Sequence, residues 1–515
     1  MSPETAPVGA ISGPEAIHRE KLAWLKTAPP GSGLPSNVAW LSSRPPSEAA
    51  RWKAVVRRKP SRTLSGVAIV AVMTAPARCP HGRCTYCPGG LENRSPQSYT
   101  GEEPSALRGA QFGYDARAIT RHRLETLESL GHPTSKVEVI VMGGTFPSRA
   151  KVYRDDVFRG IFEGLNGATS PTLSGAQATN ERAERRLVGL TVETRPDWCD
   201  GRVLPDLLEA GVTRVEIGVE CLRDEVLRSC GRAHGVSEVA AATREARDRG
   251  LKVGYHLMLG LPGMDPAKDV EDFRRIFDDP DFRPDMVKIY PTLVLAGTAL
   301  YDEWRSGRYT PYDTATAVEV LAREKAILPS WVRIQRIQRD IPARLIAAGV
   351  RTSNVRELAL RRLAMEGRSC ACLRCREPGR RASPPSDAFA MTEQSYPAAG
   401  GREHFLAFED PGTSTVAGFL RLRFPSARTV GGLEAPVIRE LKVLGHELPV
   451  GRVAARRDDY QHRGFGRALV ERAEALARED GHRRIYVMSA VGTRAYYAKF
   501  GYERAGPHLA KTLFA

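Results

Sequence analysis

The sequence predicts an α/β protein with two sheets: a parallel sheet curled into a partial barrel, and a smaller α/β domain after it. The first observation is the regular alternation of apolar, β-branched runs with helical stretches between residues 66 and 290, which is typical of a parallel sheet. The second is a change in composition after a Pro/Ser-rich stretch near residue 385, followed by an antiparallel pair of strands and a Gly-rich helix start. A length of 515 residues accommodates two or three such domains.

We expect about six parallel strands in the barrel. The apolar runs are 66–73, 137–142, 187–193, 214–219, 253–259 and 286–290. Residues 314–366 are expected to be helical, with the Arg-rich stretch 336–342 between helices. Because chemistry in such barrels gathers at the C-terminal strand ends, the residues that follow each strand are the candidates for the site.

The chain divides into four predicted segments. Residues 1–55 form a mobile basic arm with a short helix near 16–26. The barrel domain covers 56–313, a helical and metal-binding linker covers 314–392, and the second α/β domain covers 393–515. The stretch 51–62 spans the end of the arm and carries six basic residues and Trp52. It would suit either RNA binding or a basic helix end on the surface.

The net charge of +16 predicts an anionic partner, most simply nucleic acid, with a solvated basic surface as the alternative. No apolar run approaches the roughly 20 residues of a membrane span. The N-terminus lacks the apolar core of a signal peptide, so we expect a cytoplasmic protein that uses no membrane.

Three cysteines follow the first predicted strand in the spacing C-x4-C-x2-C. Cys79, Cys84 and Cys87, the first cysteine triad, share a Gly/Pro-rich loop. Three thiolates can hold three irons of one cluster and leave the fourth iron open for a substrate. Zinc is the rival metal, although it usually takes four ligands, and the odd number of thiols argues against disulfides.

A second cysteine triad, Cys370, Cys372 and Cys375, has the spacing C-x-C-x2-C. This spacing is compact enough for a single metal ion, and it predicts a structural zinc whose fourth ligand is not evident. Free surface thiols are the alternative.

A Gly-rich helix start at 461–466 precedes a helix over 467–479. Its exposed N–H groups and the helix dipole favour a bound pyrophosphate. Tyr496 and Tyr497 follow and are candidates to protonate a leaving thiolate, or else two packing tyrosines at a helix end.

These motifs carry a resemblance. The loop around the first triad resembles the cluster loop of radical S-adenosylmethionine (SAM) enzymes, and its wording resembles that of the Elongator catalytic subunits, of the stand-alone prokaryotic type. The same family's phrases recur at 97–101, 136–146, 192–197, 255–263 and 288–293. The C-terminal part resembles the GNAT acetyltransferases, so the resemblance covers about residues 57–513.

The resemblance implies a set of cofactor-binding residues. The Gly143–Gly144 turn would approach the amino-acid end of SAM, and Lys136 would contribute to acetyl-CoA binding. It favours Tyr497 over Tyr496 beside acetyl-CoA. The remaining acetyl-CoA contacts would come from one strand and one helix start: Glu440, Leu441, Lys442, Val443, Gln461, Gly464, Phe465, Gly466 and Arg467.

The resemblance also implies a function: formation of 5-carboxymethyluridine at the wobble uridine of tRNA from acetyl-CoA. A 4Fe–4S cluster, SAM and an electron donor would supply the radical, and zinc would bind the linker. A protein lysine acetyltransferase with a structural iron–sulfur cluster is the main alternative, and a tRNA-binding scaffold is the third. The sequence departs from the family pattern in two places, at Lys442, where His is usual, and in the segment around His234, and both leave the level of activity open. A homodimer is possible, and the sequence does not decide the oligomeric state.

Overall fold

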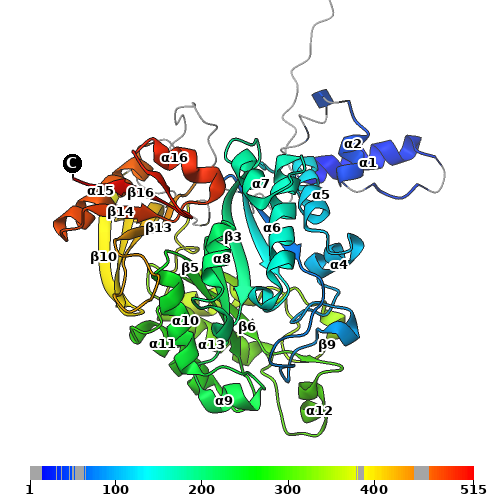
Figure 1. Cartoon of the computed structure of the whole chain (residues 1–515). Helices are drawn as coiled ribbons and strands as arrows, with labels where there is room; N and C mark the ends of the chain where they lie inside the picture. Colours follow the sequence, from blue (N-terminus) through cyan, green and yellow to red (C-terminus); the bar gives the residue numbers. More distant parts are fainter. Residues whose placement is uncertain are drawn as a thin grey trace, which may run out of the picture.

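The computed structural model contains two seven-stranded sheets, one built from residues 67–337 and the other from residues 390–512 (Figure 1). The structure describes residues 14–514 apart from 30–31, 36, 46, 49–51, 53–62, 64, 379, 381–387 and 446–462. Within these described residues no helix is long and apolar enough to cross a membrane.

The larger sheet is parallel throughout, in the order β1-β2-β3-β4-β5-β6-β8. Its strands are β1 Val67–Met73, β2 Lys136–Met142, β3 Arg186–Thr194, β4 Arg214–Glu220, β5 Lys252–Leu259, β6 Met286–Pro291 and β8 Arg333–Ile337. The helices that cover it include α4 Pro104–Gln111, α5 Ala116–Ser129, α6 Lys151–Asn166, α7 Leu173–Asn180, α8 Leu204–Glu209, α9 Asp224–Ser229, α10 Val236–Arg247 and α11 Pro266–Asp278. The predicted partial barrel is confirmed.

The sheet has one strand more than the sequence indicated. The seventh strand, β8, lies in a stretch that we expected to connect or form helices. Of its side chains only that of Ile334 is fully buried, so the run reads as polar and lacks the apolar signature of the other strands. The rest of this stretch contains α13 Thr314–Ala326, α14 Val355–Met365 and β9 Ile346–Ala348. Before it lie α12 Ala299–Arg305 and β7 Val294–Leu295, which pairs with β9 in a two-stranded ribbon.

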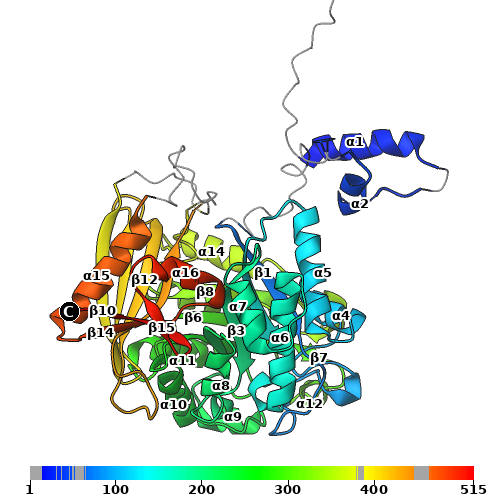
Figure 2. The same ribbon diagram turned by 45° about the horizontal axis from the view of Figure 1, so that its top comes forward.

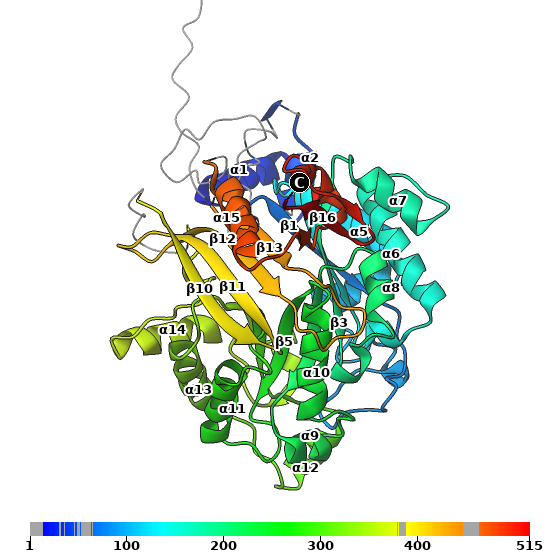
Figure 3. The ribbon, with the colours of Figure 1, turned by 60° about the vertical axis from the view of Figure 1, so that its left-hand side comes forward.

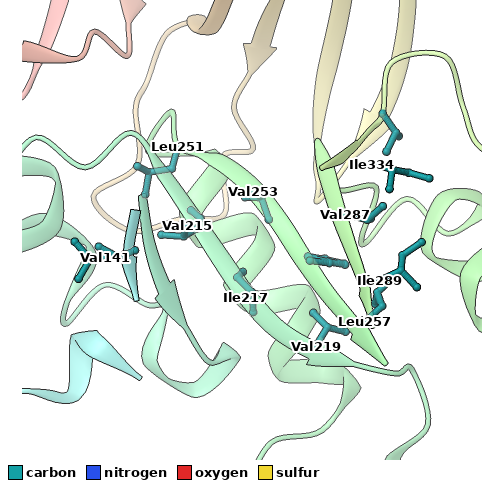
Figure 4. Packing of buried hydrophobic residues seen from close by; sticks show 14 of the residues in the cluster. Val141, Val215, Ile217, Val219, Leu251, Val253, Leu257, Val287, Ile289 and Ile334 are labelled. Carbon is teal, nitrogen blue, oxygen red and sulfur yellow. The ribbon is translucent and has the colours of Figure 1, made fainter. Parts of the chain in front are cut away.

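The barrel core is built from branched side chains of neighbouring strands (Figure 4). Val215, Ile217, Val253, Val287 and Ile289 are all fully buried. Strands of a parallel sheet are covered by helices, so their sequences become nearly continuous apolar runs, and these runs made the strands predictable. Each such side chain stabilises the fold by about 1.5–3 kcal/mol on burial.

The smaller sheet follows the order β10-β11-β12-β13-β14-β16-β15 (Figure 3). Its strands are β10 Ala390–Ala398, β11 Gly401–Glu409, β12 Val416–Phe424, β13 Val437–Val443, β14 Arg484–Val487, β15 Glu503–Ala505 and β16 His508–Thr512. Helices α15 Phe465–Glu479 and α16 Arg494–Ala498 accompany it. Only β13 and β14 pair in parallel, and all other pairs are antiparallel.

A fully buried network of charges joins the two sheets. Arg439 of β13 makes a bidentate contact with Asp285, which precedes β6, with both N···O distances at 2.7 Å. Arg439 also donates to Glu403 of β11 at 2.7 Å, and Arg247 of α10 contacts both carboxylates. Breaking a buried pair costs about 3–5 kcal/mol, so this network fixes one domain against the other.

The N-terminal arm contains α1 Pro14–Thr27 and α2 Asn37–Ser42 (Figure 2), and α2 lies close to α5. The expected helix near 16–26 is therefore present. Trp52 does not stand free for a nucleic-acid base: it is buried edge-on against Trp40, with ring centroids 5.2 Å apart. The other residues of the basic stretch 51–62 lie outside the described residues.

Candidate functional site

The first cysteine triad opens into a pocket at the C-terminal ends of the barrel strands. Its loop follows β1, and the three thiols line the pocket together with the residues that end β2 and β3. Strands β5 and β6 add His256 and Tyr290 to the lining, and Arg339 joins them from the loop after β8. The topology of a parallel barrel therefore gathers the predicted site residues at one edge.

Charge around the triad is balanced by a residue that sequence reasoning missed. Arg232 Nη1 lies 3.7 Å from the Cys84 Sγ and 3.4 Å from a carboxylate oxygen of Glu220. Burial raises the pKa of the Cys84 thiol, and Arg232 opposes that rise. Burial alone would lower the pKa of Arg232, but Tyr86, Glu220 and Cys84 together raise it, so the guanidinium stays charged. A buried cation of this kind stabilises metal-bound thiolates.

The turn after β2 needs its two glycines. Gly143 and Gly144 have φ of +134° and +88°, which favour glycine. A Cβ on Gly143 would lie 2.1 Å from the Thr74 hydroxyl oxygen, and one on Gly144 would lie 2.8 Å from the Gln97 side chain. Thr74 and Gln97 occupy the space that side chains at these two positions would need, so the close packing of this turn requires glycine. The SAM contact at this turn stays a prediction.

Glu193 lies at the end of β3 and Arg195 directly follows the strand, and each contacts a partner other than its neighbour. Glu193 accepts from the Tyr99 hydroxyl at 3.1 Å and from the Gly143 N–H at 3.3 Å. Arg195 pairs with Asp197 at 2.8 Å. Glu193 therefore ties the Tyr99 loop to the glycine turn.

A column of ionisable side chains runs through the barrel beneath the pocket. Arg214 contacts Glu138 at 2.5 Å and Glu216 at 3.4 Å. Glu216 then contacts His256 at 3.1 Å and the Lys288 ammonium. Burial alone would raise the pKa of Glu138, but Arg214 and Lys442 lower it to about 2. Charged residues that interrupt the apolar runs of β2, β4, β5 and β6 were the signal that could have found this column.

The second cysteine triad is more compact than the first. Its three sulfur atoms all lie within 4.8 Å of one another, and Lys325 Nζ lies 3.2 Å from the Cys370 Sγ. Tetrahedral zinc with Zn–S of 2.3 Å places sulfurs roughly 3.8 Å apart, so the group fits one zinc ion. Among the described residues no fourth His, Cys, Asp or Glu joins this group.

Strand β13 leaves its partner part-way along the smaller sheet. Only Val437 and Ile438 pair with β14, so the main chain from Arg439 to Val443 has no β14 partner. Leu441 packs in the core beneath α15, whereas Glu440 and Lys442 interact electrostatically with Lys252 of the barrel. The predicted contact strand thus offers backbone groups beside a splayed pair of strands.

Helix α15 begins at this splay. Gly464 caps it with φ of +84°, and a Cβ on Gly466 would lie 2.7 Å from the Tyr496 hydroxyl. Phe465 is held between two aromatic rings, and Arg467 is exposed above Phe500. Bare N–H groups at this end suit a pyrophosphate. Gln461 lies outside the described residues.

The two candidate tyrosines have different surroundings. Tyr496 is 39% exposed, whereas Tyr497 is 6% exposed and belongs to the core of the smaller sheet. Burial raises the pKa of both hydroxyls, which therefore remain protonated at neutral pH. Their assignment to catalysis stays a prediction.

Comparisons with known proteins agree with both halves of the fold. The radical SAM superfamily matches residues 74–276, the radical SAM C-terminal domain matches 284–365, and the acetyltransferase (GNAT) family matches 373–502. The tRNA uridine(34) acetyltransferase of Methanocaldococcus jannaschii is 43% identical over 508 residues, or 96% of this chain and 94% of that protein. Elongator complex protein 3 of Homo sapiens is 43% identical, with 94% and 90% covered.

A solved structure extends the likeness to three dimensions. The archaeal Elp3 of Methanocaldococcus infernus, truncated at its N-terminus, has a TM-score of 0.77 and 40% identity, and covers 87% of this chain and 100% of its own. This chain belongs to the Elongator complex protein 3 family. The predicted family is confirmed, and a radical SAM domain implies a 4Fe–4S cluster and SAM, as a GNAT domain implies acetyl-CoA.

The departures from the Elongator complex protein 3 pattern now have a structural setting. Lys442 interacts with Glu138 of the barrel and with Glu377 of the linker, so its charge is matched. His234 is buried, and burial, Arg232 and Arg195 lower its pKa to about 3, so it is neutral. Lys136 is the first residue of β2, at the end of the strand opposite the glycine turn and two residues before Glu138. Because Glu138 interacts with Lys442 of β13, Lys136 lies at the end of the barrel nearer the GNAT strand.

Proposed function

We propose that this protein forms 5-carboxymethyluridine at the wobble uridine of tRNA from acetyl-CoA. The observation that carries the proposal is the first cysteine triad opening into a pocket above the charged barrel column, in the same chain as a splayed GNAT strand. Carbon 5 of uracil is a poor site for ordinary acetyl transfer, which explains why one chain would combine these two sites.

The triad fits a 4Fe–4S cluster better than zinc. In the described residues its thiols are not among the groups of ligands that lie within 4.8 Å of one another, unlike those of the second triad. A wider spacing suits a cluster, whose irons each take one thiolate. With SAM bound and an electron donor, such a cluster supplies a 5′-deoxyadenosyl radical.

The chain's own residues position the reactants. The Gly143–Gly144 turn would approach the amino-acid end of SAM, and Glu193 holds that turn through the Gly143 N–H. Strand β13 and the start of α15 would hold acetyl-CoA through backbone groups. The Tyr497 hydroxyl, kept protonated by burial, would protonate the coenzyme A thiolate when the thioester is hydrolysed.

The second triad would hold zinc as a structural ion in the linker. Cys370 and Cys372 are buried, and the nearby Lys325 ammonium favours their thiolate forms. A site with buried ligands next to the start of β8 would stabilise the linker rather than take part in chemistry.

The test uses anaerobically reconstituted protein with SAM, a reductant, acetyl-CoA and unmodified tRNA, followed by mass spectrometry of the tRNA nucleosides. We expect 5-carboxymethyluridine from the wild type and from Cys199→Ala, a buried cysteine outside the pocket. Cys84→Ala should form none and should lose the iron–sulfur absorption. Intact SAM cleavage without a modified uridine would contradict the proposal, and acetylated lysine in a test protein would favour the alternative.

A further inference from the structure

A second hollow lies on the linker, separate from the pocket of the first triad. It is an open groove of about 770 Å³ between α14, the loop of the second triad and the turn at 412–414. Four arginines line it and define what we call the arginine groove: Arg356, Arg368, Arg374 and Arg380.

The groove carries more positive charge than the protein neutralises. Arg356, Arg368 and Arg374 form no ion pair with any carboxylate in the part of the chain that the structure describes. Among the described residues that line the groove, Glu357 is the only acid. A zinc ion on the three thiols of the second triad would leave one net negative charge there, which is still too little to balance the arginines.

The guanidinium groups are held in place but not satisfied. Arg356 Nη2 lies 3.5 Å from the Ile334 carbonyl and Arg374 Nη1 lies 3.4 Å from the Gln335 carbonyl, both long for hydrogen bonds. Arg356 Nη1 is buried with no hydrogen-bond partner. Buried donors are nearly always paired, so an unpaired guanidinium N–H at the edge of a basic groove indicates a ligand that accepts hydrogen bonds and carries negative charge.

We propose that the arginine groove binds backbone phosphates of the tRNA substrate, an inference that rests on the proposed function. Guanidinium groups match phosphate oxygens in a bidentate geometry, and an open groove admits a polymer. The excess of basic residues in the whole chain, +16, is consistent with such a partner.

The position of the groove favours RNA. Arg356 and Arg374 lie against the carbonyls of Ile334 and Gln335 in β8. Four residues further along the chain, Arg339 lines the pocket of the first triad. At about 3.3 Å per residue, at most roughly 13 Å of backbone separate Gln335 from Arg339. An RNA strand with one base in the pocket covers that distance within a few nucleotides.

The experiment compares two charge-matched double variants. Arg368→Gln with Arg374→Gln removes two groove cations, and Arg274→Gln with Arg361→Gln removes two exposed arginines elsewhere on α11 and α14. The dissociation constant for unmodified tRNA is measured at several salt concentrations, and thermal unfolding checks that both variants fold. Arg368→Gln alone, at an exposed position, serves if the double groove variant unfolds.

We expect the groove variant to lower the slope of log affinity against log salt by about 1.5, because two phosphate contacts are lost. The control should keep the wild-type slope. Equal slopes in the two double variants would overturn the inference, as would a change in coenzyme A affinity without a change for tRNA, which would assign the groove to coenzyme A phosphates. Failure of the wild type to bind tRNA would instead contradict the proposed function.

Discussion

The two cysteine triads of this chain have similar spacings but opposite settings. The first lines an open pocket at the strand ends, and its Cys84 thiol lies beside the buried Arg232. The second is drawn together within 4.8 Å, beside Lys325 and the start of β8. The first can hold a group that reacts with a substrate, whereas the second can hold a structural ion.

This contrast teaches that cysteine spacing predicts metal binding, while the fold decides what the metal is for. A loop at the C-terminal end of a barrel strand leaves room for a cluster and a ligand. A loop folded against an edge strand and a lysine leaves room for a single ion.

The largest effects are expected when one cysteine of each triad is replaced in turn and both metals are measured. Cys87→Ser should lose iron and lower the rate of uridine modification on the order of 10³-fold or more, because a reaction centre is lost. Its zinc content should be unchanged. Metal analysis and nucleoside mass spectrometry measure the two effects, and a Cys87→Ser protein with full iron content would break the comparison.

The reciprocal variant should act on stability. Cys372→Ser should lose zinc, keep its iron, and lower the free energy of unfolding by about 4 kcal/mol, because a structural ion contributes directly to folding. Denaturant unfolding with Cys230→Ser, a buried cysteine outside this triad, as the control would measure it. Loss of iron along with zinc would show that the two sites depend on each other.

The charges beneath the first triad predict a dependence on pH. Arg214 and Lys442 lower the pKa of Glu138 to about 2 against the opposing effect of burial. Its contribution is complete above pH 4.5 and is lost as pH falls to 2, which amounts to roughly 3 kcal/mol. Glu138→Gln lacks this titration. In acid unfolding measurements, the difference in free energy of unfolding between wild type and variant should therefore decrease as pH falls from 4.5 to about 2. A constant gap would contradict the low pKa.

The thioester step should be independent of both triads. Tyr497→Phe should slow acetyl-CoA hydrolysis by about 10²-fold, because the general acid is removed, and Tyr496→Phe should matter much less. Cys84→Ala should keep this step. A coenzyme A release assay measures all three variants, and the reverse order of the tyrosines would assign the role to the hydroxyl beside Gly466.

The smallest effect is expected at Lys442. Backbone groups of β13 would hold acetyl-CoA, so Lys442→His, which restores the residue usual in the family, should change the modification rate by about twofold at most. A tenfold gain in the same nucleoside assay would instead give that side chain a part in proton transfer.

Much of the fold was predictable because burial on both faces makes parallel strands apolar. Six of the seven barrel strands follow that pattern, and β8 escaped because Arg333, Gln335 and Arg336 give it a polar sequence. The splay of β13 from β14 could not be predicted, since pairing across a sheet leaves no mark in either strand.

The candidate site was predictable where its residues are close in sequence. The two triads and the glycine turn after β2 are local motifs. In the structure the first triad lines a pocket, and the sulfurs of the second triad lie close together. Arg232 meets Cys84 only because the loop after α9 folds back to the loop after β1, so no spacing revealed it. Trp52 looked exposed because its neighbour Trp40 is twelve residues away in a segment without a clear pattern.

The buried charges between the sheets have a consequence for anyone who wishes to dissect or recombine the protein. Asp285 and Arg247 belong to the barrel domain, and Arg439 and Glu403 belong to the domain of the smaller sheet. Cutting the chain within the linker would leave buried charged side chains without their partners in each fragment. Replacing one domain by that of a distant relative would supply only one side of these ion pairs. The two domains would therefore have to be expressed and engineered together.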